Sequence, residues 1–342
     1  MLMKEIRVQD AVGQILCHDM MQIRKGEKKT LLFSKGHVLE QKDIPLLKDN
    51  GKEYIFVWEN NGKVLLQNEA AADLYDLCRN DHMHPTPIQE GQVHLVADID
   101  GLLLVNKEKL KEINSQEDLI VATRHGRFPV KKGEVIAGAR VIPLGIDKDK
   151  IREVREILGE EKLLTLMPYH HKKVGILTTG NEVWSGRVED TFTPVIKEKL
   201  AQYDTEIIGQ KVTDDNISLQ IDALEYFLEK GADIILCTGG MSVDPDDRTR
   251  HSIQVVSDRV VTYGVPVLPG SMFMLAYCNN GVPILGLPSS VIYSRRTAFD
   301  LFLPFLMADV PVTKEDISSL GDGGMCLFCE TCTYPNCGFG KY

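Results

Sequence analysis

The chain has 342 residues, with 39 Lys and Arg against 49 Asp and Glu and a net charge of −10. Its composition, 43% hydrophobic and 26% charged, is typical of a soluble globular protein, and its length suggests two or three domains. The acidic balance argues against a nucleic-acid binder and against docking to an anionic membrane surface. No apolar stretch is long enough for a bilayer helix and no signal peptide is evident, so we expect a cytoplasmic protein.

The first part of the chain, residues 1–165, is expected to form a mixed, β-rich region of one or two subdomains. Ala71, Leu74, Tyr75 and Cys78 recur at helical spacing and predict a helix. Residues 1–165 show no pattern typical of catalysis. The predicted helices cover 42–50, 68–80 and 149–158, and the predicted strands cover 30–33, 54–58, 94–97, 102–105, 119–122 and 135–144.

Residues 172–310 form the second expected domain, because strand and helix patterns alternate there. The predicted strands cover 173–178, 205–210 and 233–238. Helices are expected to begin near Pro194, after a cap at Asn216, and near Asp247, and Gly231 is expected to end the second of them. This alternation predicts a parallel sheet with right-handed crossovers.

Two glycine-containing loops, 178–183 and 238–247, follow predicted strands, at the edge where parallel sheets bind ligands. Glycine lets the backbone approach a ligand, and Thr and Ser add hydroxyl donors. Nearby acids would repel a bare phosphate, so a divalent cation, typically Mg²⁺, is expected between them and the ligand. The alternative is that they are solvated turn residues and helix caps. These acids are Glu182, Asp214, Asp215, Asp244, Asp246 and Asp247.

Five motifs occur in this domain in order: ILTTGNEV (176–183), VTDD (212–215), CTGGMSVDPDD (237–247), PGSMF (269–273) and GLPSS (286–290). Through them, residues 173–306 resemble the molybdopterin-binding domain shared by the MoeA, MogA and gephyrin proteins of molybdenum-cofactor biosynthesis. The runs DAVGQILCHDM and FSKGHVL resemble, more weakly, the start of the longer, MoeA-type proteins. The resemblance implies a three-layer α/β/α domain that binds molybdopterin. In the MoeA-type proteins it also implies molybdate insertion with Mg²⁺ and hydrolysis of an adenylylated intermediate.

The resemblance also assigns residues to the site. Glu182, Asp215 and Asp247 match acidic positions near the metal and molybdate chemistry and are the candidate catalytic residues. The candidate cofactor-binding residues lie on the turns of the motifs: Thr179, Gly180, Asn181, Gly239, Gly240, Met241, Ser242, Gly270, Ser271, Pro288 and Ser289.

Several turns depart from the family pattern. The usual KPGKPF is LPGSMF, so Leu268 and Ser271 replace two lysines that would attract molybdate and phosphate. GLPGNP becomes GLPSSV, SVGDYD becomes SVDPDD, and the DSN turn becomes Asp190-Thr191-Phe192. Pterin-nucleotide binding is therefore favoured over molybdate insertion. Four arginines either substitute for the lost lysines or lie on helix surfaces: Arg248, Arg250, Arg295 and Arg296.

The tail, residues 321–342, carries Cys326, Cys329, Cys332 and Cys337. In a reducing cytosol such a cluster favours metal ligation over disulfides, and the spacing suits Zn²⁺ or an iron–sulfur cluster. The tail has little apolar surface, so we expect metal binding to order it. The alternatives are a flexible tail of free thiols, or thiolates that contact a partner or a metal in transit. The remaining cysteines are expected to fill buried space: Cys17, Cys78, Cys237 and Cys278.

Three functions compete for this sequence. The first is a molybdate insertase, a transferase-like enzyme of molybdenum-cofactor maturation. The second is a non-catalytic molybdopterin carrier or sensor whose tail docks to a molybdoenzyme or reports redox state. The third is a nucleotide hydrolase of the competence-damage-inducible type. The expected ligand is molybdopterin, the expected assembly is a dimer or trimer, and no nucleic acid or membrane is expected as a partner.

Overall fold

The computed structural model describes residues 3–22, 30–58, 64–245 and 247–341, and the chain forms two compact units. Unit 1 comprises Met1–Asp98, Leu104–Gly126 and Lys132–Leu166. Unit 2 comprises Ile99–Leu103, Arg127–Lys131 and Met167–Tyr342. Within the described ranges, no helix is long and apolar enough to cross a bilayer.

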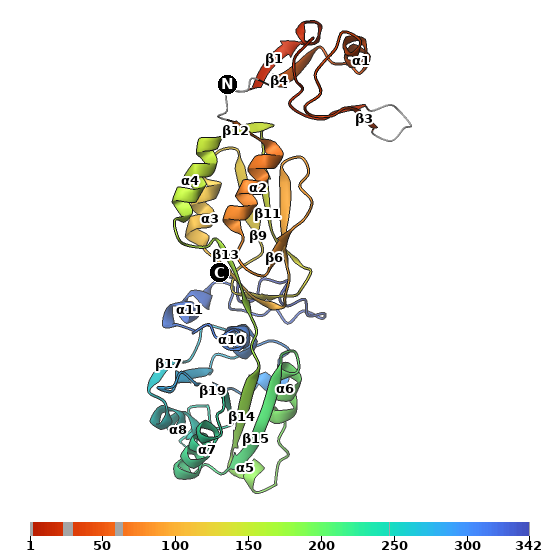
Figure 1. Cartoon of the computed structure of the whole chain (residues 1–342). Coiled ribbons are helices and arrows are strands. Elements are labelled where there is room, and N and C mark those ends of the chain that lie inside the picture. Colours follow the sequence, from red (N-terminus) through yellow and green to blue (C-terminus); the bar gives the residue numbers. More distant parts are fainter. Residues whose placement is uncertain (1–2, 23–29, 59–63, 246, 342) are drawn as a thin grey trace. The chain divides into compact units, whose positions relative to one another are not determined.

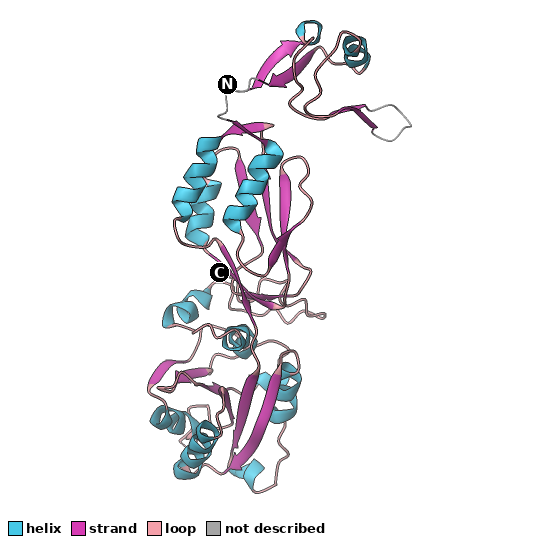
Figure 2. Ribbon diagram, in the orientation of Figure 1, coloured by secondary structure: helices cyan, strands magenta, loops and turns pink. Residues whose placement is uncertain are grey.

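Unit 1 contains small antiparallel sheets (Figures 1 and 2). Strand β1 pairs with β4, β2 with β3 and β5 with β12, and a four-stranded sheet has the order β6-β7-β11-β9. The mixed, β-rich character expected of this region is confirmed. The strands are β1 (Met3–Arg7), β2 (Met20–Gln22), β3 (Thr30–Phe33), β4 (Tyr54–Trp58), β5 (Val64–Leu66), β6 (Met83–Pro85), β7 (Gln92–Ala97), β9 (Leu119–Thr123), β11 (Val135–Val141) and β12 (Gly145–Asp147).

The helices of unit 1 follow the predicted periodicity with one addition. In α2 the four residues at helical spacing, Ala71 to Cys78, are all buried, which confirms that helix. Helix α3 was not predicted, although the Asn106 side chain caps it by accepting from the Lys109 N–H at 3.1 Å. The helices are α1 (Asp43–Asp49), α2 (Gln67–Cys78), α3 (Lys107–Asn114), α4 (Lys148–Leu158) and the 3-10 turn η1 (Val8–Asp10).

Unit 2 is built on a six-stranded sheet of order β15-β14-β16-β19-β18-β17. Strands β15, β14, β16 and β19 are parallel, and β18 is antiparallel to both β19 and β17. The predicted parallel sheet is confirmed, with β15 longer than expected. The strands are β14 (Lys172–Thr179), β15 (Thr205–Thr213), β16 (Ile234–Thr238), β17 (Arg259–Tyr263), β18 (Met274–Tyr277) and β19 (Pro283–Leu287). The chain also forms β8 (Gly101–Val105), β10 (Phe128–Val130) and β13 (Leu164–Pro168).

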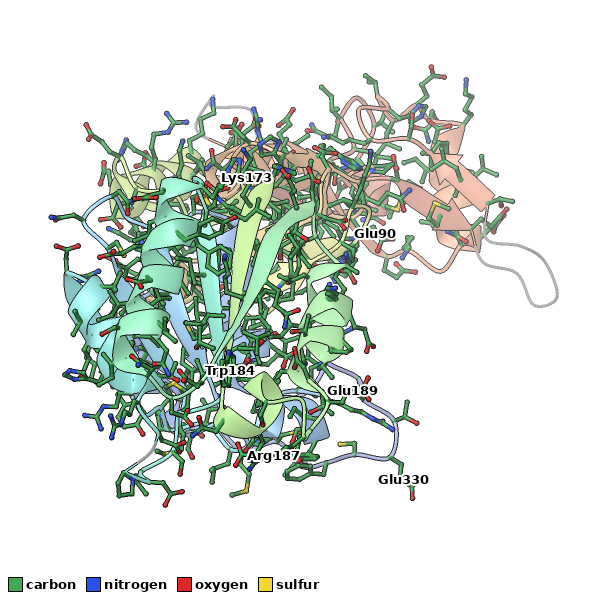
Figure 3. The ribbon with its side chains drawn as sticks, turned by 90° about the horizontal axis from the view of Figure 1, so that it is seen from below. Glu90, Lys173, Trp184, Arg187, Glu189 and Glu330 are labelled. Atoms are coloured by element: carbon green, nitrogen blue, oxygen red, sulfur yellow. The ribbon has the colours of Figure 1, made fainter. Side chains whose placement is uncertain are left out.

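Helices cover both faces of the six-stranded sheet, with α7 and α8 on one side and α6 on the other (Figures 1 and 3). Buried Phe227 of α7 packs where a Cβ on Gly175 would lie, so this glycine lets α7 approach β14 closely. The α/β/α fold class is confirmed. The helices are α5 (Asn181–Trp184), α6 (Phe192–Leu200), α7 (Ile217–Glu229), α8 (Thr249–Val256), α9 (Ser290–Tyr293), α10 (Ala298–Met307), α11 (Lys314–Ser318) and the 3-10 turn η2 (Ser319–Gly321).

Two helix boundaries in unit 2 differ from the prediction. Helix α6 begins at Phe192, before Pro194, because the Asp190 carboxylate accepts from the N–H groups of Phe192 and Thr193 at 2.9 and 3.2 Å. Helix α8 begins at Thr249, two residues after Asp247. The predicted cap of α7 is confirmed, since the Asn216 side chain accepts from the Ser218 N–H at 2.9 Å.

The tail packs against its own domain through backbone hydrogen bonds and a buried aromatic side chain. The Leu268 N–H donates to the Gly324 carbonyl and the Cys326 N–H donates to the Leu268 carbonyl, both at 2.8 Å. The Tyr334 hydroxyl donates to the Asp300 carbonyl at 3.0 Å, and Phe339 is buried. Sequence reasoning missed these anchors because each depends on a partner far away in the chain.

Candidate functional site

The predicted turns meet at one edge of the six-stranded sheet. The parallel strands β14, β15, β16 and β19 end there, and the antiparallel strand β18 begins there, with Met274 opposite Gly286. In Figure 3, the label Lys173 shows where β14 starts, and the label Trp184 shows α5, which follows the end of this strand. The ligand edge expected for a parallel sheet therefore gathers all five motifs.

The first loop is held to the end of β15 by its backbone. The Gly180 N–H donates to the Thr213 carbonyl at 3.1 Å, and the Asn181 N–H donates to the Asp215 carboxylate at 3.2 Å. Gly180 has φ +131, a conformation that favours glycine. Thus Gly180, Asn181 and Asp215 lie together, and Glu182 follows on the exposed helix α5.

The glycines of the second loop face the protein itself. A Cβ on Gly239 would meet the Thr179 carbonyl oxygen, and a Cβ on Gly240 would meet the Thr249 hydroxyl. Thr179 and Thr249 are buried. The fold itself therefore excludes side chains at Gly239 and Gly240.

The predicted acids lie near one another at this edge. Burial is the main reason that the pKa of Asp215 is raised above its ordinary value, and the carboxylates of Glu182, Asp247 and Asp214 raise it further. Asp247 also closes its own loop, since its carboxylate accepts from the Ser242 N–H at 2.9 Å. A concentration of uncompensated negative charge of this kind favours a cation.

The acids alone do not complete a metal site. In the ranges that the structure describes, no group of three or more His, Cys, Asp and Glu side chains is placed to hold a metal ion. Mg²⁺ is usually bound by one or two carboxylates together with substrate phosphates and waters. The carboxylates at this edge would therefore need oxygen ligands from elsewhere to complete a Mg²⁺ site. Asp246, another of the predicted acids, lies outside the described residues.

Met241 and Ser242 differ in their surroundings. The Met241 side chain is 4% exposed and packs in the core against Gly286. This burial could not be predicted from the residue type, because Met occurs both in cores and on binding surfaces. Ser242 is exposed at the site edge, and the Tyr263 hydroxyl donates to the Met241 carbonyl at 3.0 Å.

The remaining two turns are built by close packing. Gly270 is buried at φ +114, and a Cβ there would press on the backbone of Ala298. Ser271 is partly exposed and its carbonyl accepts from the Val265 N–H at 2.9 Å. Pro288 is buried and Ser289 is exposed at the start of α9.

Three of the four arginines considered as substitutes for the missing lysines are engaged by their own protein, and the fourth, Arg248, is exposed. Arg250 stacks on the Tyr263 ring with 4.1 Å between its guanidinium carbon and the ring centroid. Arg296 pairs with the Asp300 carboxylate at 3.0 Å, and Arg295 donates to the Glu330 carbonyl at 2.7 Å. Arg295 and Arg296 therefore lie at the tail.

A polar network beside the first loop was not among the predicted site residues. Asp190 accepts from the Gln210 amide at 2.6 Å, and the same amide donates to the hydroxyls of Thr178 and Thr193 at 3.0 and 2.9 Å. Burial raises the pKa of Asp190, but hydrogen bonds from Thr193, Gln210 and Phe192 outweigh it, so the pKa lies below its ordinary value. The available signal was an Asp placed three residues before Thr193, a typical helix cap.

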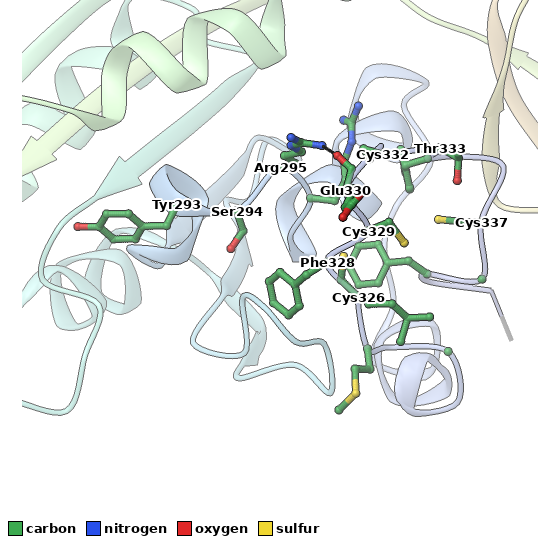
Figure 4. A pocket seen from close by; sticks show the side chains of 17 residues that line it. Tyr293, Ser294, Arg295, Cys326, Phe328, Cys329, Glu330, Cys332, Thr333 and Cys337 are labelled. Atoms are coloured by element: carbon green, nitrogen blue, oxygen red, sulfur yellow. Dashed lines mark hydrogen bonds between the residues drawn. The ribbon is translucent and has the colours of Figure 1, made fainter.

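The four tail cysteines line one cavity of about 500 Å³ together with Arg295 and Arg296 (Figure 4). Among the residues that the structure describes, however, no three of these cysteines are placed to hold a metal ion, so the structure does not support the predicted metal site. Cys329 and Cys332 are exposed. Burial raises the pKa of Cys332, but the Tyr334 N–H, a hydrogen bond from Arg296 and the charge of both arginines outweigh it and lower that pKa.

The other four cysteines lie in the interior of the protein, which confirms that they fill buried space. Cys237 and Cys278 belong to the core beneath α7 and α8, and Cys17 and Cys78 are buried in unit 1. Burial raises the pKa of Cys17 to about 11 and that of Cys78 to about 12.

Comparison with known families gives two matches along the chain. Residues 175–308 match the family described as a probable molybdopterin binding domain, and residues 5–59 match a domain of unknown function. The predicted resemblance is thereby confirmed for 175–308.

The chain is similar to several curated proteins over part of its length. It is 32% identical over 92 residues to a molybdopterin adenylyltransferase of Pyrococcus furiosus, covering 27% of this chain and 54% of that protein. It is 32% identical over 77 residues to a CinA-like protein of Mycobacterium tuberculosis, covering 22% of this chain and 18% of that protein. The chain thus spans about half, or less, of the length of these relatives.

Solved structures of molybdopterin biosynthesis proteins are similar to the same region. The enzyme MoaB of Thermus thermophilus is 27% identical, with a TM-score of 0.36, over 40% of this chain and 91% of that one. The Mog protein of Mycobacterium ulcerans is 22% identical, with a TM-score of 0.35, over 40% of this chain and 94% of that one.

Proposed function

We propose that residues 175–308 bind molybdopterin, or its adenylylated form, in cytosolic molybdenum-cofactor biosynthesis and take part in molybdate insertion with Mg²⁺. The match to a molybdopterin binding domain supports the ligand. The observation that supports the metal step is the raised pKa of Asp215 beside Glu182 and Asp247, because a cation would relieve this repulsion. In this proposal the three carboxylates bind Mg²⁺ and position molybdate or water.

The loops would hold the anionic part of the ligand. Exposed Ser242 and the partly exposed backbone of Gly180 and Gly240 border the acids at the sheet edge. Backbone N–H groups and hydroxyls bind phosphate well when a cation offsets nearby carboxylates. Asp247 has a second task here, since its hydrogen bond to Ser242 shapes the loop that would contact the ligand.

A second candidate is a non-catalytic molybdopterin carrier or sensor. The observation that favours it is the position of Leu268, where the family has a lysine. The Leu268 backbone pairs with Gly324 and Cys326 of the tail, so this turn supports the tail and supplies no cation. A nucleotide hydrolase is a third candidate, favoured by the similarity to CinA-like proteins.

Release of AMP separates these functions. The purified full chain is given adenylylated molybdopterin, Mg²⁺ and molybdate, and AMP is measured together with molybdopterin binding. We expect Mg²⁺-dependent release of AMP that requires molybdate. Tight molybdopterin binding without AMP release would contradict the insertase and support the carrier. Hydrolysis of simple nucleotides without molybdate would support the nucleotide hydrolase.

Two substitutions of Asp247 separate its charge from its loop contact. Asp247→Ala removes both and should abolish AMP release. Asp247→Asn keeps an oxygen that accepts from the Ser242 N–H, so ligand binding should survive while AMP release is lost. Full turnover in Asp247→Asn would remove the proposed metal role.

For the tail we propose that Cys326, Cys329, Cys332 and Cys337 hold metal, either an iron–sulfur cluster or Zn²⁺. Their spacing supports this. Iron, zinc and acid-labile sulfide in anaerobically purified chain test it, and absence of metal would leave a tail of free thiols. We also propose that the chain forms a dimer or trimer and that the tail meets a molybdoenzyme.

A further inference from the structure

The cavity at the tail is a different space from the one that the motif turns border. It measures about 500 Å³ and lies between residues 293–296, at the end of α9, and tail residues between 323 and 339. Its lining in the described part of the chain includes none of the predicted cofactor-binding residues. Concave sites of roughly 300–1,000 Å³ are typical of small-molecule binding.

The tail wall of this cavity leaves large apolar side chains in contact with water. Leu327 and Phe328 line the cavity and are 80% and 70% exposed, and Met325 beside them is 62% exposed. The thiols of the tail cysteines add to this wall, because free cysteine behaves as a small apolar group. Clustered exposure of this kind is typical of a surface that a ligand covers. A planar ring inside the cavity would pack against Phe328.

The other wall carries cations that buried acids do not fully balance. Lys199 and Arg296 share the buried carboxylate of Asp300, at 2.7 and 3.0 Å, so two positive charges meet one negative charge. The Nε of Arg296 is buried and has no hydrogen-bond partner among the described residues. Its guanidinium carbon lies 4.8 Å from the ring centroid of Tyr334, whose hydroxyl donates to the Asp300 carbonyl. Arg296 is therefore held in place before any ligand arrives, which lowers the cost of binding.

Arg295 adds a second guanidinium to the same cavity. It donates to the carbonyl of Glu330 at 2.7 Å (Figure 4). This contact with a backbone carbonyl fixes the guanidinium but does not cancel its charge. The Glu330 side chain also lines the cavity and is exposed. Arginine binds carboxylate and phosphate through its fork of donors. The cavity thus combines two binders of an acidic group with an apolar wall.

We propose that the tail cavity binds a small aromatic acid, with its carboxylate or phosphate group at Arg295 and Arg296 and its planar ring against Phe328. The inference goes beyond the molybdopterin site proposed at the motif turns and requires no metal at the cysteines. The acidic group supplies negative charge that Asp300 alone does not, and the ring shields Leu327 and Phe328 from water.

The test is calorimetric titration of the full chain, reduced and freed of metal with a chelator. The probes are naphthoate and naphthyl phosphate. Naphthylmethanol carries the ring without the charge, and acetate and inorganic phosphate carry the charge without the ring. We expect an aromatic acid to bind at one site per chain, and each of the three simpler compounds to bind at least about tenfold more weakly. No binding of either aromatic acid, or equally tight binding of naphthylmethanol, would overturn the proposal.

Two substitutions locate the site. Arg295→Gln and Phe328→Ala should each weaken binding of the aromatic acid about tenfold, because one removes a cation and the other removes the ring contact. Arg250→Gln, stacked on Tyr263, and Phe56→Ala, at a partly exposed ring in unit 1, are the matched controls and should not change the affinity. Unchanged affinity in either cavity variant would overturn the proposal.

Another copy of the chain is the alternative occupant of the cavity. Sedimentation of the unaltered chain and of Phe328→Ala compares their assembly. Assembly lost in Phe328→Ala, without binding of either aromatic acid, would overturn the proposal and assign the cavity to an interface between copies. Molybdopterin binding is measured on the same variants and should be unchanged, because Phe328 lies outside the motif turns. The two proposals can therefore fail separately.

Discussion

The hydroxyl oxygens of Thr179 and Thr249 lie 2.7 Å apart in the interior, joining the end of β14 to the start of α8. Thr179 also donates to the Thr238 carbonyl at 3.2 Å. The first loop and the second loop are therefore fixed to each other beneath the acidic edge. The two glycines between these threonines have no room for a side chain.

Gly239→Ala should destabilise the protein more than a glycine substitution in open space. Gly281 is the matched control, because its φ of +83 is nearly that of Gly239, +82, and a Cβ there meets nothing within 4 Å. Gly281→Ala should cost about 1–2 kcal/mol for the left-handed backbone. Gly239→Ala should cost about 1–3 kcal/mol beyond that, because its Cβ meets the Thr179 carbonyl. Urea unfolding measures both, and equal costs would contradict the contact.

Two aspartates at the sheet edge should affect the pH dependence of stability in opposite ways. The pKa of Asp190 is lowered in the folded protein. Its contribution to the free energy of unfolding is therefore present above the ordinary pKa of 3.8 and is lost as the pH falls through the folded pKa. Asp190→Asn should therefore destabilise the protein near neutral pH.

The folded pKa of Asp215 is raised, so stability is lost as pH rises from 3.8 through the folded pKa. Asp215→Asn should for that reason stabilise the protein at neutral pH, by less than about 1 kcal/mol because solvent screens the group. The gain should disappear below the ordinary pKa of 3.8, where both states are protonated. Unfolding curves between about pH 3 and pH 7 measure the difference. A loss of stability at neutral pH in this variant would show that its hydrogen bond to Asn181 outweighs the repulsion.

Lys199 and Asp300 form a buried ion pair at 2.7 Å, with side chains 9% and 4% exposed. Lys199→Met should cost about 3–5 kcal/mol, because it leaves a buried carboxylate with fewer partners. Lys172 is the control: its partner Asp309 is 61% exposed, at 2.5 Å, so Lys172→Met leaves a carboxylate that water can solvate. Thermal unfolding of both variants compares them, and similar losses would contradict a special cost at Asp300.

The cysteines of the reduced, chelator-treated chain should differ in their reactivity toward alkylating reagents. Alkylation at neutral pH should modify Cys332 early, because its pKa is lowered and it is exposed. Cys78 and Cys237 should react only in denaturant, because burial raises the pKa of both. Arg295→Gln should slow the labelling of Cys332 without changing the labelling rate of Cys237. Mass spectrometry of the labelled peptides measures both rates. Early modification of Cys237 would indicate that the core opens.

Much of the site could be predicted from local sequence. The motif turns follow short apolar runs, and the side-chain cap at Asn216 is a property of neighbouring residues, so strand ends and helix starts were close to the structure. Helix α6 begins two residues before Pro194, because the Asp190 carboxylate accepts from the N–H groups of Phe192 and Thr193. The burial of the Met241 side chain could not be predicted, because its neighbour Gly286 is 45 residues away.

The sequence by itself determined the alternation of strands and helices in 172–310, the chemistry of its turns and the presence of four clustered thiols, because these depend on residues close together in the chain. Only the tertiary structure decided which glycines face Thr179 and Thr249, and that Arg295 and Arg296 lie against the tail. It also showed that Tyr334 and Phe339 order the tail. The physical reason is that burial and charge pairing are set by neighbours in space, which the order of residues does not reveal.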